Sequence, residues 1–343
     1  MLTILIDQPI TPEHLARLRA AAGVIVRQVE MEAKAVERPA DLIADVDILL
    51  CKLPPKNIDD MRRLKLIQLA SVGYEHLRHV GFADRPIQFC NARGLFDTAI
   101  AEWNIAMMIN LTRDLRGMIR RQDAGQWERL DTFQQEIRGK TVGLWGYGGI
   151  GRETARVAKA LGMTVQVLTR SGVKPRLRDW TPAGTGDPEG KLPDRVFTAG
   201  QEQEFLSRLD FLILALPRTQ ATNGMVGERE LRALPKQAFV LNPARGPIIQ
   251  EQPLIRALHE GWIAGAALDT HYHYPMPADH PLWRFPNVIM TPHISGADKS
   301  SLFPQRLGEL FLANVQRWIN REPLWNEVTA DEWRETEAMQ NEK

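Results

Sequence analysis

A glycine-rich turn framed by strand-like and helix-like segments constrains the fold of this chain most strongly. The turn is Gly146-Tyr147-Gly148-Gly149-Ile150-Gly151; it follows the apolar run 141–145 and precedes a helical pattern over 153–161 and a second apolar run over 164–168. The first glycines permit a tight turn and a close approach to a pyrophosphate, and Gly151 lets the helix pack on the strand. The frame favours dinucleotide binding at a helix N-terminus over a chance glycine turn.

Strand-like and helix-like segments alternate along nearly the whole chain, which predicts parallel sheets wrapped by helices. We therefore expect an α/β protein with two Rossmann-like, doubly wound parallel-sheet domains. The expected strands are 3–6, 24–29, 47–51, 64–69, 86–90, 141–145, 164–168, 211–216, 238–241, 263–268 and 288–291. The expected helices include 12–21, 57–63, one long helix from 101 to about 121, and 300–320.

The order of these segments predicts how the domains divide. We expect a first, substrate-binding domain made of residues 1–105 and 300–330, which makes it discontinuous, and a dinucleotide-binding domain over 106–299. Residues 331–343 are expected to be a tail, and the acidic, polar chain from Glu322 onward to be poorly packed. Residues 172–200 are rich in Gly, Pro and charge, and predict a long surface loop beside the cofactor.

Composition indicates which kinds of partner are not expected and in which compartment the protein is expected. The 343 residues carry 43 basic and 42 acidic side chains, interspersed, for a net charge of +1, so neither a nucleic-acid nor a membrane partner is predicted. The apolar runs fall short of the ~20 residues of a membrane helix. The chain starts directly as a strand, and Cys51 and Cys90 lie in apolar runs. This pattern predicts a cytoplasmic protein with reduced core cysteines.

The end of the second strand of a dinucleotide fold selects the ribose. Here it reads Thr169-Arg170-Ser171, without the carboxylate that would bind the 2′-hydroxyl of NAD. Arg170 could pair with a 2′-phosphate, which favours NADP, with NAD still possible; the alternative is a solvated arginine in a polar turn. Lys174, Arg176 and Arg178 follow, and could help to hold the phosphate or could equally form a solvated loop.

Two charged or titratable side chains follow later strands. Arg245 comes after the apolar run 239–241, and His293 after 288–291. Ligands of open α/β sheets bind at these carboxyl ends. A guanidinium there can fork onto a carboxylate and polarise the adjoining carbonyl, and an imidazole can move a proton in either direction. Each could instead only cap a strand end.

Four further segments make the chain resemble the D-isomer-specific 2-hydroxyacid dehydrogenase family over most of residues 40–320. They are Gly139-Lys140-Thr141-Val142-Gly143, Asn242-Pro243-Ala244-Arg245-Gly246, Gly265-Ala266-Ala267-Leu268-Asp269 and Thr291-Pro292-His293-Ile294-Ser295-Gly296. The resemblance implies two α/β domains, usually in a homodimer, and hydride transfer between a nicotinamide and the 2-carbon of a small 2-oxo or 2-hydroxy acid. Members of the NADP type are commonly glyoxylate or hydroxypyruvate reductases.

The resemblance also implies roles for individual residues. It makes Arg245 the substrate-binding arginine and His293 the acid/base, and it places backbone groups of Ser71, Val72 and Gly73 on the substrate carboxylate, although that loop could be an ordinary turn. Within the glycine turn, the resemblance implies that Gly149 and Ile150 contact the pyrophosphate. Outside the turn, it implies that Pro217 borders the adenosine side and that Pro243, Asp269 and Gly296 lie near the nicotinamide.

One departure from the family stands beside the catalytic histidine. Counting without gaps, Tyr274 occupies the place of the family's Glu, in a segment similar to that of formate dehydrogenases, which have a neutral Gln there. A neutral partner stabilises an imidazolium less than a carboxylate does. We therefore expect a lower pKa for His293 than in relatives with Glu, so that ketone reduction fades at a lower pH. Alternatively, Tyr274 only packs against its surroundings.

Three rival interpretations are disfavoured. Formate dehydrogenases grip their substrate with an Asn whose place is taken by Phe96, so oxidation of formate is not expected. The cluster 271–274 has alternate histidines with no adjacent acid or thiolate, so no metal is expected. A dinucleotide-sensing scaffold, as in the C-terminal-binding-protein co-repressors, would fit the missing Glu, but the chain lacks the basic or low-complexity tails of a scaffold.

Overall fold

The computed structural model describes residues 1–337 apart from 75–76, 78–79, 83–84, 130–133 and 177–178. The chain divides into two compact units. The first unit comprises Met1–Leu95, Arg178–Pro182 and Lys299–Lys343, and the second comprises Phe96–Leu177 and Ala183–Asp298. Both are α/β units built on a parallel sheet, and the first is discontinuous in sequence.

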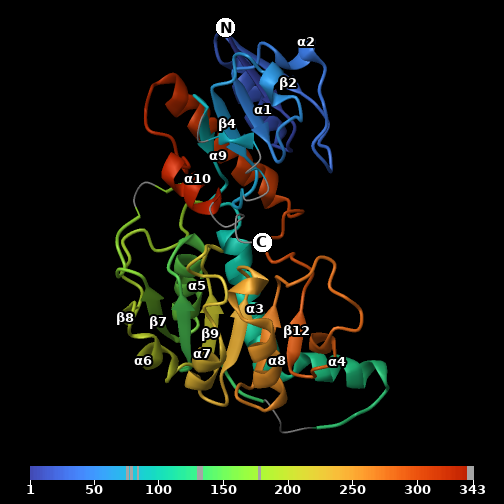
Figure 1. Cartoon of the computed structure of the whole chain (residues 1–343), viewed down its shortest axis with the longest axis vertical. Coiled ribbons are helices and arrows are strands. Elements are labelled where there is room, and N and C mark those ends of the chain that lie inside the picture. Colours follow the sequence, from blue (N-terminus) through green and yellow to red (C-terminus); the bar gives the residue numbers. More distant parts are fainter. Residues whose placement is uncertain (75–76, 78–79, 83–84, 130–133, 177–178, 338–343) are drawn as a thin grey trace. The chain divides into compact units, whose positions relative to one another are not determined.

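The first unit has a five-stranded parallel sheet in the order β2-β1-β3-β4-β5 (Figure 1). Its strands are β1 (Leu2–Ile6), β2 (Val24–Gln28), β3 (Ile48–Cys51), β4 (Leu66–Leu69) and β5 (Gln88–Cys90), and its helices are α1 (Pro12–Ala20), α2 (Ala40–Ile43), α9 (Leu302–Ile319) and α10 (Ala330–Glu337). All four residues of β3 and of β4 are buried, as expected for strands covered on both faces.

The second unit has a seven-stranded parallel sheet in the order β12-β11-β10-β9-β6-β7-β8. The strands are β6 (Thr141–Trp145), β7 (Thr164–Thr169), β8 (Arg195–Thr198), β9 (Phe211–Leu214), β10 (Phe239–Asn242), β11 (Gly265–Leu268) and β12 (Val288–Met290). The strand order reverses between β6 and β9, and this switch point is where doubly wound sheets bind dinucleotides.

Helices cover both faces of this second sheet (Figure 1). The helices of this unit are α3 (Asp97–Arg113), α4 (Leu115–Asp123), α5 (Gly149–Ala160), α6 (Glu202–Leu206), α7 (Glu228–Ala233) and α8 (Glu251–His259), and all of them except α4 have buried residues. Successive residues of β9 alternate between two cores: Leu212 and Leu214 pack with residues of α6, α7 and α8, and Phe211 and Ile213 with residues of α3 and α5. In the described part of the chain, no helix combines the length and apolarity needed to cross a bilayer.

Two helix predictions were wrong in detail. The expected continuous helix from 101 to about 121 is broken at Asp114, which adopts a left-handed conformation with φ of 48°. Its carboxylate accepts a hydrogen bond from the Gly117 N–H and so caps α4. In the expected helix 57–63, only Ile58–Asp60 forms a short 3-10 turn.

The segment 172–200 was expected to be a surface loop, and this was wrong for part of it. Residues 195–198 form β8, the edge strand of the second sheet, paired in parallel with β7. Phe197 of this strand is 1% exposed and belongs to the core. Arg178, which was named with Lys174 and Arg176 as a residue that could help to hold the 2′-phosphate, lies outside the described residues.

The chain after Glu322 was expected to be poorly packed, and the structure contradicts this up to α10. Trp333 is 2% exposed and stacks on Tyr74, with ring centroids 5.1 Å apart. It also meets Phe82 and Phe89 edge-on. Leu324 and Val328 are buried as well. Apolar residues spaced along an otherwise charged segment therefore complete the core of the first unit.

Candidate active site

The glycine turn joins β6 to α5, and β6 is one of the two strands between which the strand order reverses. Gly146 directly follows β6 and has a φ of 100°, a conformation that favours glycine. A Cβ at Gly146 would overlap the carbonyl of Ala215, which follows β9. A Cβ at Gly151 would come within 2.6 Å of the Gly146 carbonyl oxygen. The turn is therefore as tight as a pyrophosphate cradle requires, and it leads into the N-terminus of α5.

The predicted ribose-selecting residues follow β7. Arg170 and Ser171 are exposed. The hydroxyl oxygen of Thr169 is buried and has no hydrogen-bond partner among the described residues. A buried hydroxyl without a partner is uncommon, and here it marks a polar position at the end of the strand that approaches the cofactor in a Rossmann fold.

A buried cluster that the sequence did not reveal ties the segment 174–192 to the glycine turn. The Arg152 side chain donates to the carbonyls of Tyr147, Asp187 and Lys174, and its guanidinium lies 4.9 Å from the centre of the Tyr147 ring. The Asp187 carboxylate accepts from the Tyr147 hydroxyl at 2.7 Å. It also accepts from the N–H groups of Gly190, Lys191 and Leu192.

The pKa values of this cluster follow from its burial and hydrogen bonds. Burial and the adjoining Asp187 raise the pKa of Tyr147. Burial alone would raise the pKa of Asp187, but the hydrogen bonds from the Leu192 N–H and the Tyr147 hydroxyl outweigh it and hold that pKa below its ordinary value. Asp187 is therefore an ionised carboxylate that organises the segment above the glycine turn.

Asp269, directly after β11, shapes the loop that carries His293. One carboxylate oxygen accepts from the Thr291 hydroxyl at 2.6 Å and the Ile294 N–H at 2.9 Å. The other accepts from the Ser295 N–H at 3.0 Å and the Ser295 hydroxyl at 2.5 Å. Asp269 is fully buried. Since its four acceptor positions are filled within the protein, this carboxylate holds the loop in place.

His293 and Tyr274 lie side by side. The Tyr274 hydroxyl is 3.1 Å from Nδ1 of His293, and it accepts a hydrogen bond from the His271 N–H at 3.3 Å. Because a hydroxyl can donate one hydrogen bond and accept two, Tyr274 can hold the imidazole by Nδ1 whether or not that nitrogen carries a proton. His293 has φ of 57°, a conformation fixed by hydrogen bonds from its N–H to the carbonyls of Asp269 and Thr291.

Partial burial lowers the pKa of His293 below its ordinary value of 6.5, and the positive charge of Arg245 lowers it further. The same guanidinium acts on Tyr274, whose pKa is nevertheless raised by burial. Arg245, Tyr274 and His293 thus form one electrostatic group at the carboxyl ends of the adjacent strands β10, β11 and β12. His293 is consequently a neutral base at pH 7 that becomes an acid only at lower pH.

A close backbone approach brings Arg245 to this group. A Cβ at Gly246 would come within 2.9 Å of the His271 Cα, so only glycine allows the chain after β10 to pass this close to the chain after β11. The Asn242 amide donates to the Arg245 carbonyl at 2.9 Å, and Nη1 of Arg245 donates to the Ala244 carbonyl at 2.7 Å. The guanidinium is therefore oriented before any substrate binds.

The other predicted cofactor residues occupy the ends of strands in the same sheet. Pro217 is exposed after β9, and its carbonyl accepts from the Thr222 hydroxyl at 2.7 Å. Pro243 is buried directly after β10. Gly296 packs on the ring of Phe96, since a Cβ there would come within 3.0 Å of it.

The predicted substrate loop belongs to the first unit. It follows β4, and the Ser71 hydroxyl donates to the Gly73 carbonyl at 3.0 Å. The Asn91 amide donates to the Val72 carbonyl at 3.1 Å, and the Ala92 N–H donates to the Ser71 carbonyl. With these carbonyls engaged, the loop is fixed in shape at the carboxyl end of its strand.

Comparison with known proteins agrees with this geometry. Residues 105–295 match the family model described as the NAD-binding domain of D-isomer specific 2-hydroxyacid dehydrogenases. The chain belongs to this family. It is 31% identical over 315 residues to a glyoxylate reductase of Thermofilum pendens, covering 89% of this chain and 88% of that protein.

Solved structures of the family superpose on nearly the whole chain. A D-isomer specific 2-hydroxyacid dehydrogenase family protein of Aeromonas salmonicida is 26% identical with a TM-score of 0.76, covering 96% of this chain and 99% of that one. An NADPH-dependent glyoxylate/hydroxypyruvate reductase of Sinorhizobium meliloti is 26% identical with a TM-score of 0.72, covering 96% and 98%.

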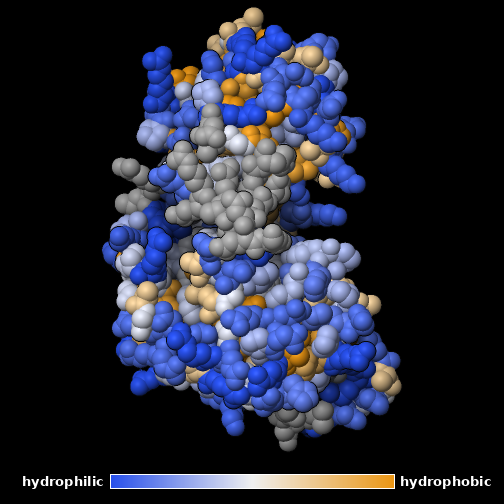
Figure 2. All heavy atoms as spheres, viewed as in Figure 1, coloured by the Kyte–Doolittle hydropathy of each residue, from blue (hydrophilic) through white to orange (hydrophobic). Residues whose placement is uncertain are grey.

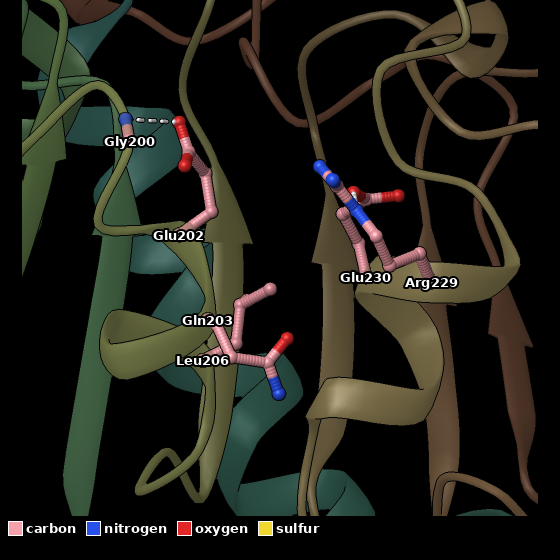
Figure 3. Close-up of a pocket in the computed structure, with 6 residues that line it drawn as sticks. All are labelled: Gly200, Glu202, Gln203, Leu206, Arg229 and Glu230. Carbon is pink, nitrogen blue, oxygen red and sulfur yellow. Dashed lines mark hydrogen bonds and ion pairs between the residues drawn. The ribbon is translucent and has the colours of Figure 1, made fainter.

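A small pocket of about 130 Å³ lies elsewhere in the second unit, between α6 and α7 (Figure 3). It is lined by Gly200, Glu202, Gln203, Leu206, Arg229 and Glu230. Glu202 accepts from the Gly200 N–H at 3.0 Å, and Arg229 pairs with Glu230 at 2.8 Å. None of the predicted site residues lines this pocket.

Proposed function

We propose that the chain reduces a small 2-oxo acid of the glyoxylate or hydroxypyruvate kind to the corresponding D-2-hydroxy acid, using NADPH. The observation that carries this proposal is the group of Arg245, Tyr274 and His293 at three adjacent strand ends. A cation to bind a carboxylate and a titratable imidazole are what carbonyl reduction needs from a protein. The relatives named glyoxylate reductase support the substrate class.

The residues divide the work as follows. The glycine turn and the α5 N-terminus bind the pyrophosphate. When bound, the nicotinamide supplies or takes up the hydride. Arg245 binds the substrate carboxylate with two hydrogen bonds and polarises the carbonyl. His293 donates the Nε2 proton to the developing alkoxide and accepts it back during oxidation. Tyr274 and Asp269 are positioning residues: the first orients the ring through Nδ1, and the second fixes the loop.

The preference for NADP is part of the proposal. Arg170 and Ser171 are exposed at the end of β7 and beside a buried, unpartnered Thr169 hydroxyl, and no carboxylate stands among them to repel a 2′-phosphate. The similar reductase of Sinorhizobium meliloti is NADPH-dependent. Comparing Kd for NADPH and NADH tests this preference, and equal values would exclude it.

We further propose that the first unit is the substrate domain, that its Ser71–Gly73 loop binds the substrate carboxylate through backbone N–H groups, and that the chain acts as a cytoplasmic homodimer. The exposed apolar residues Ile109, Leu115 and Ile119 of α3 and α4 offer a face for a second copy. Figure 2 shows the other feature of the surface, a largely hydrophilic face with patches of hydrophobic residues between the charged ones. Light scattering that gave the mass of one chain would contradict the dimer.

Turnover with a panel of 2-oxo acids tests the main proposal. NADPH oxidation is followed with glyoxylate, hydroxypyruvate, pyruvate and longer 2-oxo acids, for the natural protein and for His293→Ala and Arg245→Ala. We expect kcat to fall by about 10²–10⁴-fold in His293→Ala, as is usual for loss of a general acid, and KM to rise in Arg245→Ala. NADPH binding without oxidation by any 2-oxo acid would instead favour a dinucleotide-sensing scaffold.

A further inference from the structure

Two oppositely charged side chains lie against the glycine turn of the second unit. Asp97 has no role assigned above, and Arg176 was named only as a residue that could help to hold the 2′-phosphate. Nη1 of Arg176 lies 3.3 Å from the position that a Cβ on Gly148 would occupy. The Asp97 carboxylate lies against Gly149, where a Cβ would overlap an oxygen and come within 2.6 Å of its Cγ. Gly148 is the N-cap and Gly149 the first residue of α5, so both charges stand at the N-terminus of that helix.

The position of Arg176 is built into the fold. Its N–H donates to the Pro188 carbonyl at 2.8 Å, and the Arg152 side chain donates to the Lys174 carbonyl at 2.5 Å. The Gly186 N–H, across the same segment, donates to Glu153 of α5 at 2.6 Å. The segment that carries Arg176 is therefore anchored on the helix that begins with the glycine turn.

We propose that Arg176 is a further cofactor-binding residue, which pairs with the pyrophosphate of the dinucleotide and not with the 2′-phosphate. The inference deepens the proposed function and rests on dinucleotide binding at this turn. The glycine turn is the part of a Rossmann fold that the pyrophosphate approaches, whereas the 2′-phosphate is bound at the end of β7, where Arg170 lies. A guanidinium beside Gly148 can therefore form hydrogen bonds with the pyrophosphate.

Asp97 explains why this turn uses a side-chain cation in addition to the helix N-terminus. A carboxylate at the first residue of α5 occupies the favourable end of the helix dipole and repels a second anion there. Arg176 supplies the compensating positive charge on the same turn. The two side chains should therefore have opposite effects on cofactor affinity, and both effects should be independent of the 2′-phosphate.

The experiment measures Kd for NADPH and for NADH by quenching of tryptophan fluorescence, without substrate, so that it does not depend on turnover. The variants are Arg176→Ala, Asp97→Asn and Arg170→Ala, with Lys174→Ala as the matched control, since Lys174 is an exposed cation of the same segment. Circular dichroism and thermal unfolding check that each variant folds.

We expect Arg176→Ala to weaken both dinucleotides by about ten-fold, the size of one charge-assisted hydrogen bond, and to make binding less sensitive to salt. Asp97→Asn should tighten both, Arg170→Ala should weaken NADPH alone, and Lys174→Ala should change neither by more than about two-fold. If Asp97→Asn is poorly folded, the comparison of Arg176→Ala with Arg170→Ala is sufficient to test the proposal.

Two results would overturn the inference. An Arg176→Ala variant that loses affinity for NADPH alone would make this residue a 2′-phosphate ligand, and one that binds both dinucleotides like the natural protein would remove it from the site. If the natural protein bound neither dinucleotide, the proposed function itself would fail, which is a distinct outcome.

Discussion

At the scale of single residues, the pair of Tyr274 and His293 sets the protonation chemistry of this protein. The phenol is 3.1 Å from the imidazole and can orient the ring, but it brings no negative charge to stabilise the imidazolium. Burial and Arg245 then lower the pKa of His293, and the negative charges of Asp269 and Asp298 offset only part of this lowering. Reduction needs the imidazolium as proton donor, so it should decline as pH rises through a value below 6.5.

Replacing the phenol by a carboxylate tests this directly. In Tyr274→Glu, the negative charge beside Nδ1 should raise the pKa of His293, and the decline of 2-oxo acid reduction should move to higher pH by about one unit or more. The measurement is the pH profile of kcat/KM. Tyr274→Phe is the control and should not move the decline upward. An unchanged profile in the Glu variant would show that another group governs the imidazole.

Sequence reasoning identified the residues of this group but not their geometry. Arg245 and His293 each lie within a motif of consecutive residues, so their roles could be predicted from the sequence. Asp97 and Arg176 were not recognised as neighbours of the glycine turn. Asp97 lies 52 positions before Gly149 and Arg176 lies 28 positions after Gly148, so only tertiary folding brings them onto the turn. Asp269 was expected to lie near the nicotinamide, and this stays a prediction; the sequence did not reveal that its carboxylate also shapes the loop of His293 through four hydrogen bonds.

At the scale of elements, the segment 174–192 depends on one buried carboxylate. Asp187→Ala would leave the N–H groups of Lys191 and Leu192 and the Tyr147 hydroxyl without their acceptor, which should lower the free energy of unfolding by about 3 kcal/mol. Urea unfolding measures this loss, and trypsin should cut the segment faster.

The control for this prediction is Glu189→Ala in the same segment. Glu189 pairs with Lys191 in an ion pair whose two side chains are 60% and 79% exposed, and such pairs contribute little. The stability of this variant should stay within about 0.5 kcal/mol of the natural protein. Equal stability of the two variants would mean that the buried cluster does not hold the segment.

The irregular elements were the ones the sequence could not specify. The Gly- and Pro-rich composition of 172–200 concealed β8, since a four-residue edge strand gives too short a pattern to detect. Asp114 interrupts a continuous run of helix-forming residues, and the break depends on its own side chain capping the next turn. The buried strands were predictable because each is a continuous apolar run, and α5 was predictable because its apolar residues recur with helical spacing over several turns.

At the scale of the whole molecule, alternation of strands and helices was enough to predict two parallel sheets, and comparison with solved structures confirms this architecture. The packing of the last helix was not predictable in the same way. The segment that contains Trp333 is mostly charged, and a single large apolar side chain gives no periodicity. Its burial depends on the cavity formed by Tyr74, Phe82 and Phe89, which are distant in sequence.

Truncating that tryptophan should destabilise the first unit. Trp333→Ala removes a side chain that is 2% exposed, and such changes cost about 3–5 kcal/mol. Urea unfolding followed by circular dichroism should show a clearly lower midpoint. Trp127, which is 94% exposed, provides the control, and its replacement by Ala should shift stability by no more than about 0.5 kcal/mol. Similar midpoints for the two variants would contradict the packing role of α10.

Because the first unit is discontinuous in sequence, the ribosome completes its synthesis only after the second unit has been made. Synthesis delivers β1 to β5 first, yet α9 and α10, which complete that unit, arrive only with residues 299–343. Every residue of the second unit has left the peptidyl-transferase centre by then. Since domains fold as units during translation, the nascent amino-terminal sheet must wait, with an uncovered apolar face, while the inserted unit matures.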